Sequence, residues 1–262
     1  MQNLFSFRFS ENIWRVMPDA DPKSALWVIE LRNAETREVS FAIVDLHSQT
    51  LKWHRALEGT DWWTLLTAFS HNRIYLHNYR NPEIPEPTDL MAVDAETGII
   101  SWFLPDYVLV KSIHDNVLEV ATKQGDRFKH AHCDAVTGKL SPLKEHASES
   151  GTEVILKEPV RYREENMYFE RLAQFIVDAT GGHMPVAIDY LEKRPYIIFS
   201  YYIYEQDKTV QYLLIVTDHK QQVLHEKLSE EREGTGRSTM MLKASTLVYL
   251  KNSNEFSSLT LS

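Results

Sequence analysis

A valine–aspartate pair with a tryptophan eight residues after the aspartate occurs twice in this chain of 262 residues. The first pair is Asp45 with Trp53, and the second is Asp94 with Trp102 in the stretch MAVDAETGIISW. The two aspartates are 49 residues apart. Each pair is flanked by apolar runs of strand length, so one repeat unit contains several strands.

Two weaker copies of the unit follow. The third begins at Asp134 and has Pro142 at the tryptophan position, and the fourth retains Asp218 and little else. Their aspartates lie 40 and then 84 residues further on, and 84 is close to two periods. Multi-stranded repeats of roughly 40–50 residues are typical of β-propeller blades. The sequence therefore predicts an all-β chain that forms one β-propeller domain of four-stranded blades over residues 1–262.

The second copy shows how one unit works. Asp94 ends an apolar strand at the head of a turn, where its carboxylate can accept backbone N–H groups. Gly98 can adopt the positive φ that a tight hairpin with a bulge needs. Trp102 then lies on the outgoing strand, so we expect its large ring to wedge against a neighbouring sheet.

The stretch AVDAETGIISW matches the motif A-x-D-x-x-T-G-x-x-x-W. It resembles the tryptophan-docking motif of quinoprotein-type (pyrroloquinoline quinone-like) β-propeller repeats. The resemblance implies that the tryptophan docks between adjacent blades and has a structural role. The chain as a whole resembles an uncharacterised Bacteroidetes family of about this length, and that resemblance implies no activity. The matching residues are Ala92, Asp94, Thr97, Gly98 and Trp102, with Asp45 and Trp53 in the half-kept copy.

The repeat period also places the strands. The last three strands lack a fourth partner, and Leu4–Phe9 alternates with Phe5, Phe7 and Phe9 on one face. We expect this N-terminal strand to complete the final blade and close the ring, which leaves no open ladder between the termini. The expected blades are Trp14–Leu57, Trp62–Leu104, Tyr107–Leu143, a fourth from near His183, and the strands around Met240–Leu242, Leu247–Leu250 and Ser257–Leu261.

The stretch 144–182 does not fit the period. The apolar residues Phe169, Leu172, Ala173 and Ile176 have helical spacing, and Gly181–Gly182 can form a C-cap, so we expect a short inserted helix near 166–180. The letters VDATG also resemble a degenerate copy of the turn, which would make this stretch a blade. We favour the helix with five blades, and six blades is the alternative.

Composition excludes several classes of partner. The net charge of −9, without a Lys/Arg-rich run, disfavours nucleic acid. The N-terminus has no secretory signal pattern, and no stretch approaches 18 uninterrupted apolar residues, so we expect a cytoplasmic protein without a membrane segment. Cys133 is the one cysteine, so no intrachain disulfide forms.

Candidate chemistry is sparse. A single complete docking motif and a lone cysteine do not carry over a quinoprotein dehydrogenase activity, so we expect no cofactor. No nucleophile elbow, P-loop, G-x-G-x-x-G or H-E-x-x-H occurs, and we assign no catalytic residue. In HAHCD, His130 and His132 share a strand face with Asp134 and can give two or three metal ligands. Asp134 belongs to the turn, so a solvated strand face without metal is our interpretation.

Two loops are candidates for binding. The stretch RNPEIPEPTD, Arg80 to Asp89, contains Pro82, Pro85 and Pro87, and prolines stiffen a loop and lower the entropy lost on binding. It is either an interaction loop or a rigid surface excursion. The stretch EGTGR, Glu233–Arg237, is either a small anion nest or a connection between blades.

These observations favour a non-enzymatic cytoplasmic scaffold that binds an unknown protein partner. A propeller presents rigid loops, and the sequence has no catalytic signature. The alternative is a small-molecule-binding or hydrolytic propeller with a site at the central channel, where residues distant in sequence converge.

Overall fold

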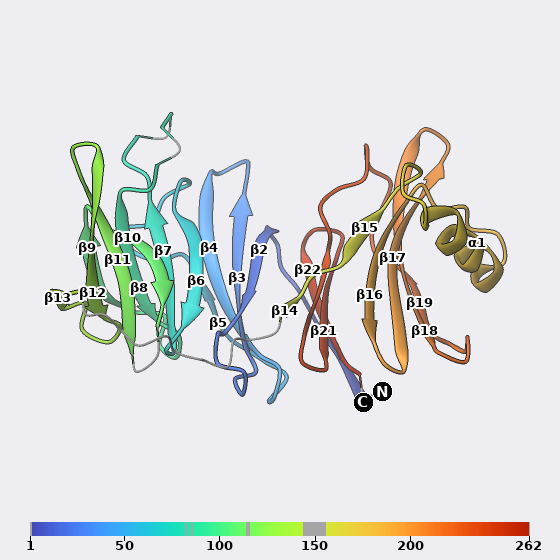
Figure 1. Ribbon diagram of the computed structural model, residues 1–262, viewed down its shortest axis with the longest axis horizontal. Helices are drawn as coiled ribbons and strands as arrows, with labels where there is room; N and C mark the ends of the chain where they lie inside the picture. Colours follow the sequence, from blue (N-terminus) through green and yellow to red (C-terminus); the bar gives the residue numbers. More distant parts are fainter. Residues whose placement is uncertain (1, 82, 85, 114–115, 144–155, 262) are drawn as a thin grey trace. The chain divides into compact units, whose positions relative to one another are not determined.

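The computed structural model describes the chain except residues 1, 82, 85, 114–115, 144–155 and 262 (Figure 1). The chain forms two compact units, Glu11–Val154 and Met1–Ser10 with Ile155–Ser262. Five antiparallel sheets account for the strands of the described residues, as predicted for an all-β chain. The single domain over 1–262 stays a prediction.

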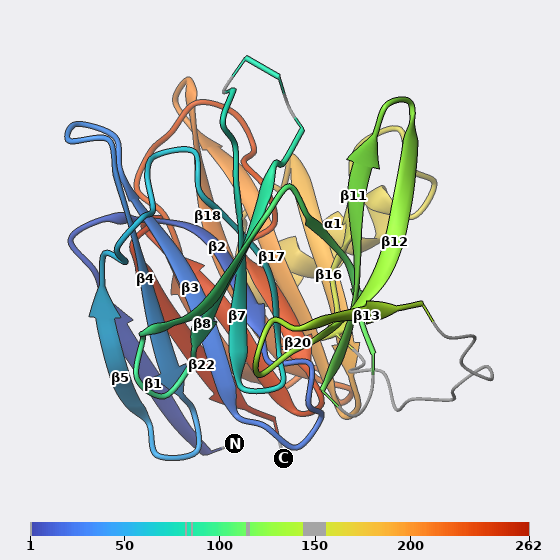
Figure 2. The ribbon, with the colours of Figure 1, turned by 90° about the vertical axis from the view of Figure 1, so that its left-hand side faces the viewer.

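The Glu11–Val154 unit contains three four-stranded sheets, each with its strands in chain order. This meander of four strands is the pattern predicted for propeller blades. Figure 2 shows β11 and β12 of the third sheet as a long hairpin. The strands are β2 (Asn12–Pro18), β3 (Leu26–Asn33), β4 (Glu38–Asp45) and β5 (Thr50–Arg55); β6 (Leu65–Ser70), β7 (Arg73–Asn78), β8 (Asp89–Asp94) and β9 (Ile100–Pro105); and β10 (Val108–Ser112), β11 (Val117–Gln124), β12 (Arg127–Asp134) and β13 (Leu140–Pro142).

Apolar side chains join the three sheets of this unit. Phe41 and Trp53 of the first sheet pack in one buried cluster with Leu76 of the second. A separate cluster joins the second sheet, through Trp102, to Cys133 of the third. Because strand side chains alternate between faces, the second sheet buries both of its faces against neighbours.

The second unit contains two sheets of five strands. Three sheets of the chain therefore have the predicted four strands, and these two have one more. Their orders are β1 (Gln2–Arg8), β22 (Glu255–Thr260), β21 (Thr246–Lys251), β20 (Met240–Lys243) and β14 (Leu156–Lys157), and then β15 (Val160–Tyr162), β16 (Ala187–Lys193), β17 (Tyr196–Glu205), β18 (Lys208–Thr217) and β19 (Gln222–Lys227).

The extra strands are β14 and β15, from the stretch predicted as an insertion. They have two and three residues, which is too short to show a period-two pattern in the sequence. Each adds to one edge of its sheet and pairs backbone groups that would otherwise face solvent. The expectation of an insertion with a helix alone is corrected in this respect.

The N-terminal strand completes the last sheet, as predicted. β1 pairs antiparallel with β22, and the register sets Phe7 opposite Phe256 and Arg8 opposite Glu255. Beyond the strand, the N–H of Phe9 donates to the carbonyl of Asn254 at 2.8 Å. Closure of the sheets into one ring stays a prediction.

The helix predicted near 166–180 is present as α1 (Phe169–Thr180). It ends at Gly181, whose φ of 74° is the left-handed conformation of a helix C-cap. This helix lies against one face of the β15–β19 sheet (Figure 1). Its buried side chains Phe169, Ala173 and Ile176 pack in one cluster with side chains of that sheet. The other face of this sheet packs on the β20–β22 side of the unit. A helix therefore covers the face that an adjacent blade would cover in a propeller.

We expect the buried histidine His77 to make the stability of the Glu11–Val154 unit pH-dependent. Its Nε2 accepts the N–H of Leu109 at 3.0 Å, and burial lowers its pKa to about 4. The ordinary value, 6.5, lies above this, so the unfolded chain binds more protons between pH 6.5 and 4. We expect His77 to make the unit less stable by about 2 kcal/mol at pH 5 than at pH 7 in urea unfolding.

His77→Gln is the matched control, because its amide oxygen can accept the same N–H and does not titrate in this range. We expect the variant to show a smaller loss of stability between pH 7 and pH 5. An unchanged loss would show that other groups cause the pH dependence.

Candidate functional site

The two tryptophans of the repeat contact the turn of the following sheet. The indole N–H of Trp53 donates to the carbonyl of Ala95 at 2.7 Å. The indole N–H of Trp102 donates to the carbonyl of Ala135 at 3.0 Å. Both rings are buried. Each contact therefore joins two neighbouring sheets through a hydrogen-bonded indole N–H and the large apolar face of the ring.

The aspartates of the motif hold the turns that receive these rings. The Oδ1 atom of Asp94 accepts the N–H groups of Glu96 and Thr97 at 3.1 and 2.9 Å, and the Thr97 hydroxyl at 3.0 Å. Asp134 repeats the pattern with Thr137, whose hydroxyl and N–H lower the pKa of the Asp134 carboxyl. Both carboxylates therefore accept hydrogen bonds that stabilise their own turns.

Glycine is required where the rings approach the turns. Gly138 has a φ of 72°, and a Cβ placed on it would lie 2.8 Å from Cγ of Trp102. Gly98 has a φ of 65°, and its Cβ would lie 3.2 Å from Trp53. Ala92, which is fully buried on β8, is directly opposite Trp102 on β9. The motif residues thus lie together at contacts between sheets and leave no free group for chemistry.

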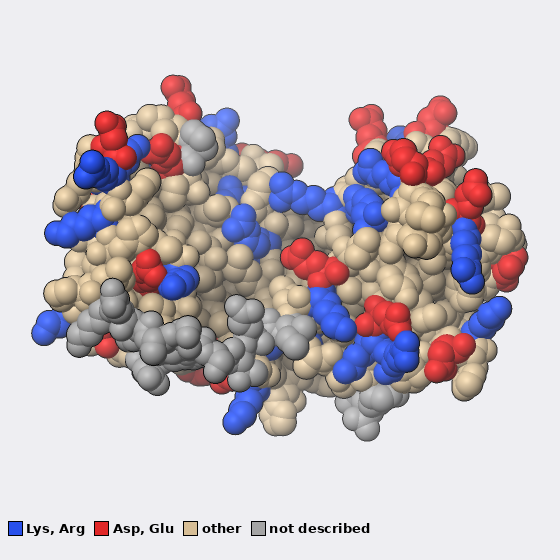
Figure 3. All heavy atoms as spheres, in the orientation of Figure 1, with Lys and Arg blue, Asp and Glu red and all other residues tan. Residues whose placement is uncertain are grey.

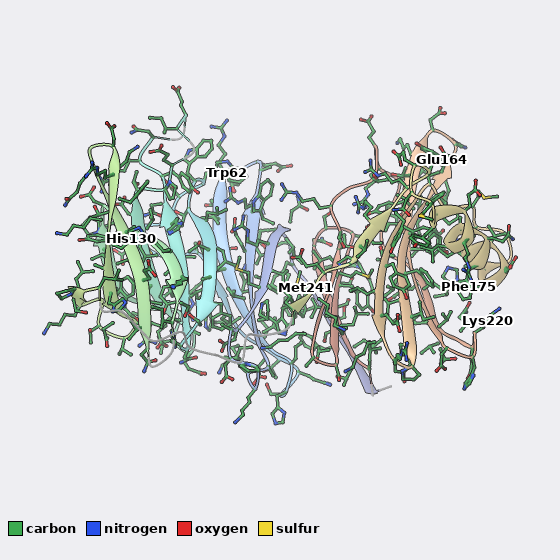
Figure 4. All side chains as sticks on the ribbon, viewed as in Figure 1. Trp62, His130, Glu164, Phe175, Lys220 and Met241 are labelled. Atoms are coloured by element: carbon green, nitrogen blue, oxygen red, sulfur yellow. The ribbon has the colours of Figure 1, made fainter. Side chains whose placement is uncertain are left out.

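The H-x-H strand places its histidines in different surroundings. His130, with 40% of its side chain exposed, has Nδ1 at 2.7 Å from Oε1 of Glu119 on the adjacent strand (Figure 4). His132 is buried, and Asp134 belongs to its turn. Within the described part of the chain, no three His, Cys, Asp or Glu side chains are grouped so that they can hold a metal ion.

The base of the Arg80–Asp89 loop is clamped by ion pairs. The guanidinium of Arg80 binds both carboxylate oxygens of Asp89, with Nε 3.1 Å from Oδ2. Its Nη1 also binds Oδ1 of Asp106 at 2.8 Å, in the turn after β9. Burial would raise the pKa of Asp89, but the hydrogen bonds from Arg80 outweigh it and the pKa is lowered. The two ends of the loop are therefore fixed to each other.

Above this clamp, the loop exposes an apolar side chain. The N–H of Thr88 donates to the carbonyl of Asn78 at 2.9 Å, and Glu86 pairs with Lys123 at 2.8 Å. Ile84 is 49% exposed. Pro87 is partly buried, whereas Pro82 and Pro85 lie outside the described residues. Ile84 is therefore exposed to solvent in a loop whose base is braced by the ion pairs of Arg80.

Sequence reasoning missed a second site, an open depression of about 380 Å³ in the other unit. It is lined by Arg161, Arg163, Glu165 and Asn166, which lead from β15 to α1. The EGTGR stretch lies against it, because the carbonyl of Gly236 accepts Nη1 of Arg161 at 2.6 Å. The sequence signals for this site are the alternation R-Y-R at 161–163 and the EGTGR stretch, which was a candidate anion nest.

Comparisons with known proteins give distant similarities. Residues 20–102, about a third of the chain, match the family model described as Domain of unknown function (DUF4905). No curated protein matches the chain. The chain is similar to a solved member of the DUF4221 family from Bacteroides vulgatus, at 10% identity and a TM-score of 0.37, over 100% of this chain and 96% of that one.

Two further solved structures are similar over most of this chain. TolB from Acinetobacter baumannii has 9% identity and a TM-score of 0.30, over 93% of this chain and 54% of that one. The Cps50 (Swd1) β-propeller domain from Myceliophteria thermophila has 9% identity and a TM-score of 0.28, over 98% and 99%. At these TM-scores the similarities carry no functional argument. The quinoprotein-type repeat and the Bacteroidetes family stay predictions.

The described residues also contain no helix that is both long and apolar enough to span a membrane. The one helix among them, α1, has 12 residues.

Proposed function

We propose that this protein is a non-enzymatic interaction scaffold that binds a protein partner through the Arg80–Asp89 loop. The observation that carries the proposal is the clamp of Arg80 onto Asp89 and Asp106, which fixes the loop before any partner arrives. A loop that is already ordered loses less conformational entropy on binding. The proposal includes five propeller-type blades, locked by quinoprotein-type tryptophan docking at Trp53 and Trp102.

The chemistry of the loop suggests the kind of surface that it fits. Ile84 is an exposed apolar side chain, and Glu83 and Glu86 flank it. An apolar side chain that enters a pocket is a common anchor of protein interfaces, and rim charges steer the encounter. The expected partner therefore offers a small apolar pocket with basic residues at its rim.

A second candidate function is small-molecule binding. It is favoured by the arginine-lined depression at Arg161 and Arg163, which has no role in the loop proposal. The loop and the depression belong to different units, so variants in one unit test each function separately.

The loop proposal is tested by exchanging residues 81–88 for a Gly/Ser segment of equal length, with Arg80 and Asp89 retained. We expect affinity capture from the native cell to yield at least one protein that wild type retains and the loop variant loses. The control exchanges the exposed β3–β4 turn, residues 34–37, for Gly/Ser, and should retain that protein. Identical sets from wild type and the loop variant would exclude the loop as the binding surface.

A further inference from the structure

The guanidinium of Arg161 is held in a fixed position at the wall of the depression. Its Nε and Nη2 atoms bind the two carboxylate oxygens of Asp189 at 2.6 and 2.7 Å, and the Asp189 side chain is only 1% exposed. A buried ion pair adds little net stability, because desolvation offsets the attraction. The pair does fix the direction of the outer edge of Arg161, which lines the depression.

Two further arginines near Arg161 have no carboxylate partner among the described residues. Arg163 is exposed and makes one hydrogen bond, from Nη2 to the hydroxyl of Thr235 at 3.2 Å. Arg232 donates from Nη2 to Oε1 of Gln211 at 2.6 Å, while its Nε is buried without a hydrogen-bond partner in the described chain. Arg161 is neutralised by Asp189, so Arg163 and Arg232 place two positive charges near the site against the one negative charge of Glu165.

Arg161 and Arg232 both lie against the loop at Gly236. The carbonyl of Gly236 accepts Arg161, and a Cβ on Gly236 would lie 3.2 Å from Nη1 of Arg232. The guanidinium carbons of both arginines are 5.3 Å from the ring centroid of Tyr202. This shared stacking on one ring restricts both side chains, so the site is preorganised.

The remaining lining residues limit which ligand fits. The carboxamide oxygen of Asn166 already accepts the N–H of Tyr168 at 2.9 Å, so its NH₂ group is left to donate. Glu165 adds one negative charge to the wall. Elsewhere on the visible face of this unit, acidic and basic side chains are interspersed (Figure 3). The attraction for an anion is therefore local and suits a small ligand, not a polyanion.

We propose that the depression lined by Arg161, Arg163 and Asn166 binds a small molecule through an oxyanion group, either a carboxylate or a phosphate. The Arg163 guanidinium makes one hydrogen bond within the described chain, so it can bind such an oxyanion by paired, charge-assisted hydrogen bonds. Arg161 donates from Nε and Nη2 to Asp189 and from Nη1 to Gly236, so it contributes mainly a fixed wall. The volume of about 380 Å³ lies at the lower end of the range for small-molecule sites. This inference is independent of the Arg80–Asp89 loop.

Calorimetric titration at constant ionic strength tests the proposal, with inorganic phosphate and acetate as separate probes. We expect saturable binding of at least one probe to the wild-type chain, and the tighter one identifies the oxyanion class. Arg163→Gln should weaken binding about tenfold, because one charge-assisted hydrogen bond is lost. Glu165→Gln should strengthen it about threefold, because a like charge is removed.

The matched control is Arg194→Gln, which removes a 90% exposed arginine beyond the far end of β16. This variant should bind both probes as wild type does. The proposal is overturned if neither probe saturates, or if Arg194→Gln weakens binding as much as Arg163→Gln, which would indicate diffuse surface attraction. Far-UV circular dichroism of each variant checks that the fold is retained.

Discussion

Replacing Trp102 by alanine is expected to lower the free energy of unfolding of the Glu11–Val154 unit by about 3–5 kcal/mol. The ring is buried between the second and third sheets, and its N–H donates to the carbonyl of Ala135. The substitution removes the ring from its contact with Gly138 and leaves a buried acceptor without its donor. Urea unfolding followed by circular dichroism measures the loss, which is a large share of a typical domain stability.

Trp63→Ala is the matched control, because Trp63 is 46% exposed in the same unit. We expect this control to cost less than about 1 kcal/mol. A similarly small cost for Trp102→Ala would show that the ring is not docked.

Deleting residues 1–10 is expected to destabilise the other unit cooperatively and to lower its thermal midpoint by about 10 °C or more. The deletion removes β1 from its ladder with β22 and removes the buried side chain of Phe9. The newly exposed edge and apolar surface of β22 would also favour aggregation. Differential scanning calorimetry of the full chain and the truncated chain gives the two midpoints.

The variant Arg8→Gln removes the surface ion pair of β1 but keeps its strand pairing, so it distinguishes the two contributions to stability. The Arg8 side chain binds Glu255 at 2.7 Å but is largely exposed, so its removal should cost at most about 1 kcal/mol. Adding a peptide of residues 1–10 to the truncated chain should restore part of the lost stability. Unchanged thermal stability after the deletion would contradict a structural role for β1.

Local periodicity explains which elements could be predicted from the sequence. The spacing of Phe169, Ala173 and Ile176 predicts the observed helix, because these side chains form one buried stripe. The alternation of Phe5, Phe7 and Phe9 predicts a strand, which the structure pairs with β22. Short elements without a full period, such as β14 and β15, carry no such signal.

In the candidate sites, contacts between residues far apart in the sequence were also hard to predict. Arg161 meets Asp189 and Gly236, which are 28 and 75 residues further along the chain. Nothing in the sequence marks these residues as partners, because the fold alone brings them together. The tryptophan contacts span 42 and 33 residues, but there a repeated motif marks both ends of each contact. Long-range contacts were therefore predictable at the repeated motif and at the strand pairing of β1 with β22, which the count of strands per repeat required.

If the Arg80–Asp89 loop is a binding surface, a charge on its exposed apolar side chain weakens partner binding. Ile84→Asp places a charge on the exposed apolar tip and leaves the clamp of Arg80 and Asp89 intact. Met184→Asp introduces the same charge at a more exposed apolar side chain in the other unit.

The measurement is the dissociation constant for the protein that the loop captures. We expect Ile84→Asp to weaken binding about tenfold or more, as for an interface anchor, and Met184→Asp to bind as wild type does. Equal affinity of wild type and Ile84→Asp, with both chains folded, would contradict the loop proposal.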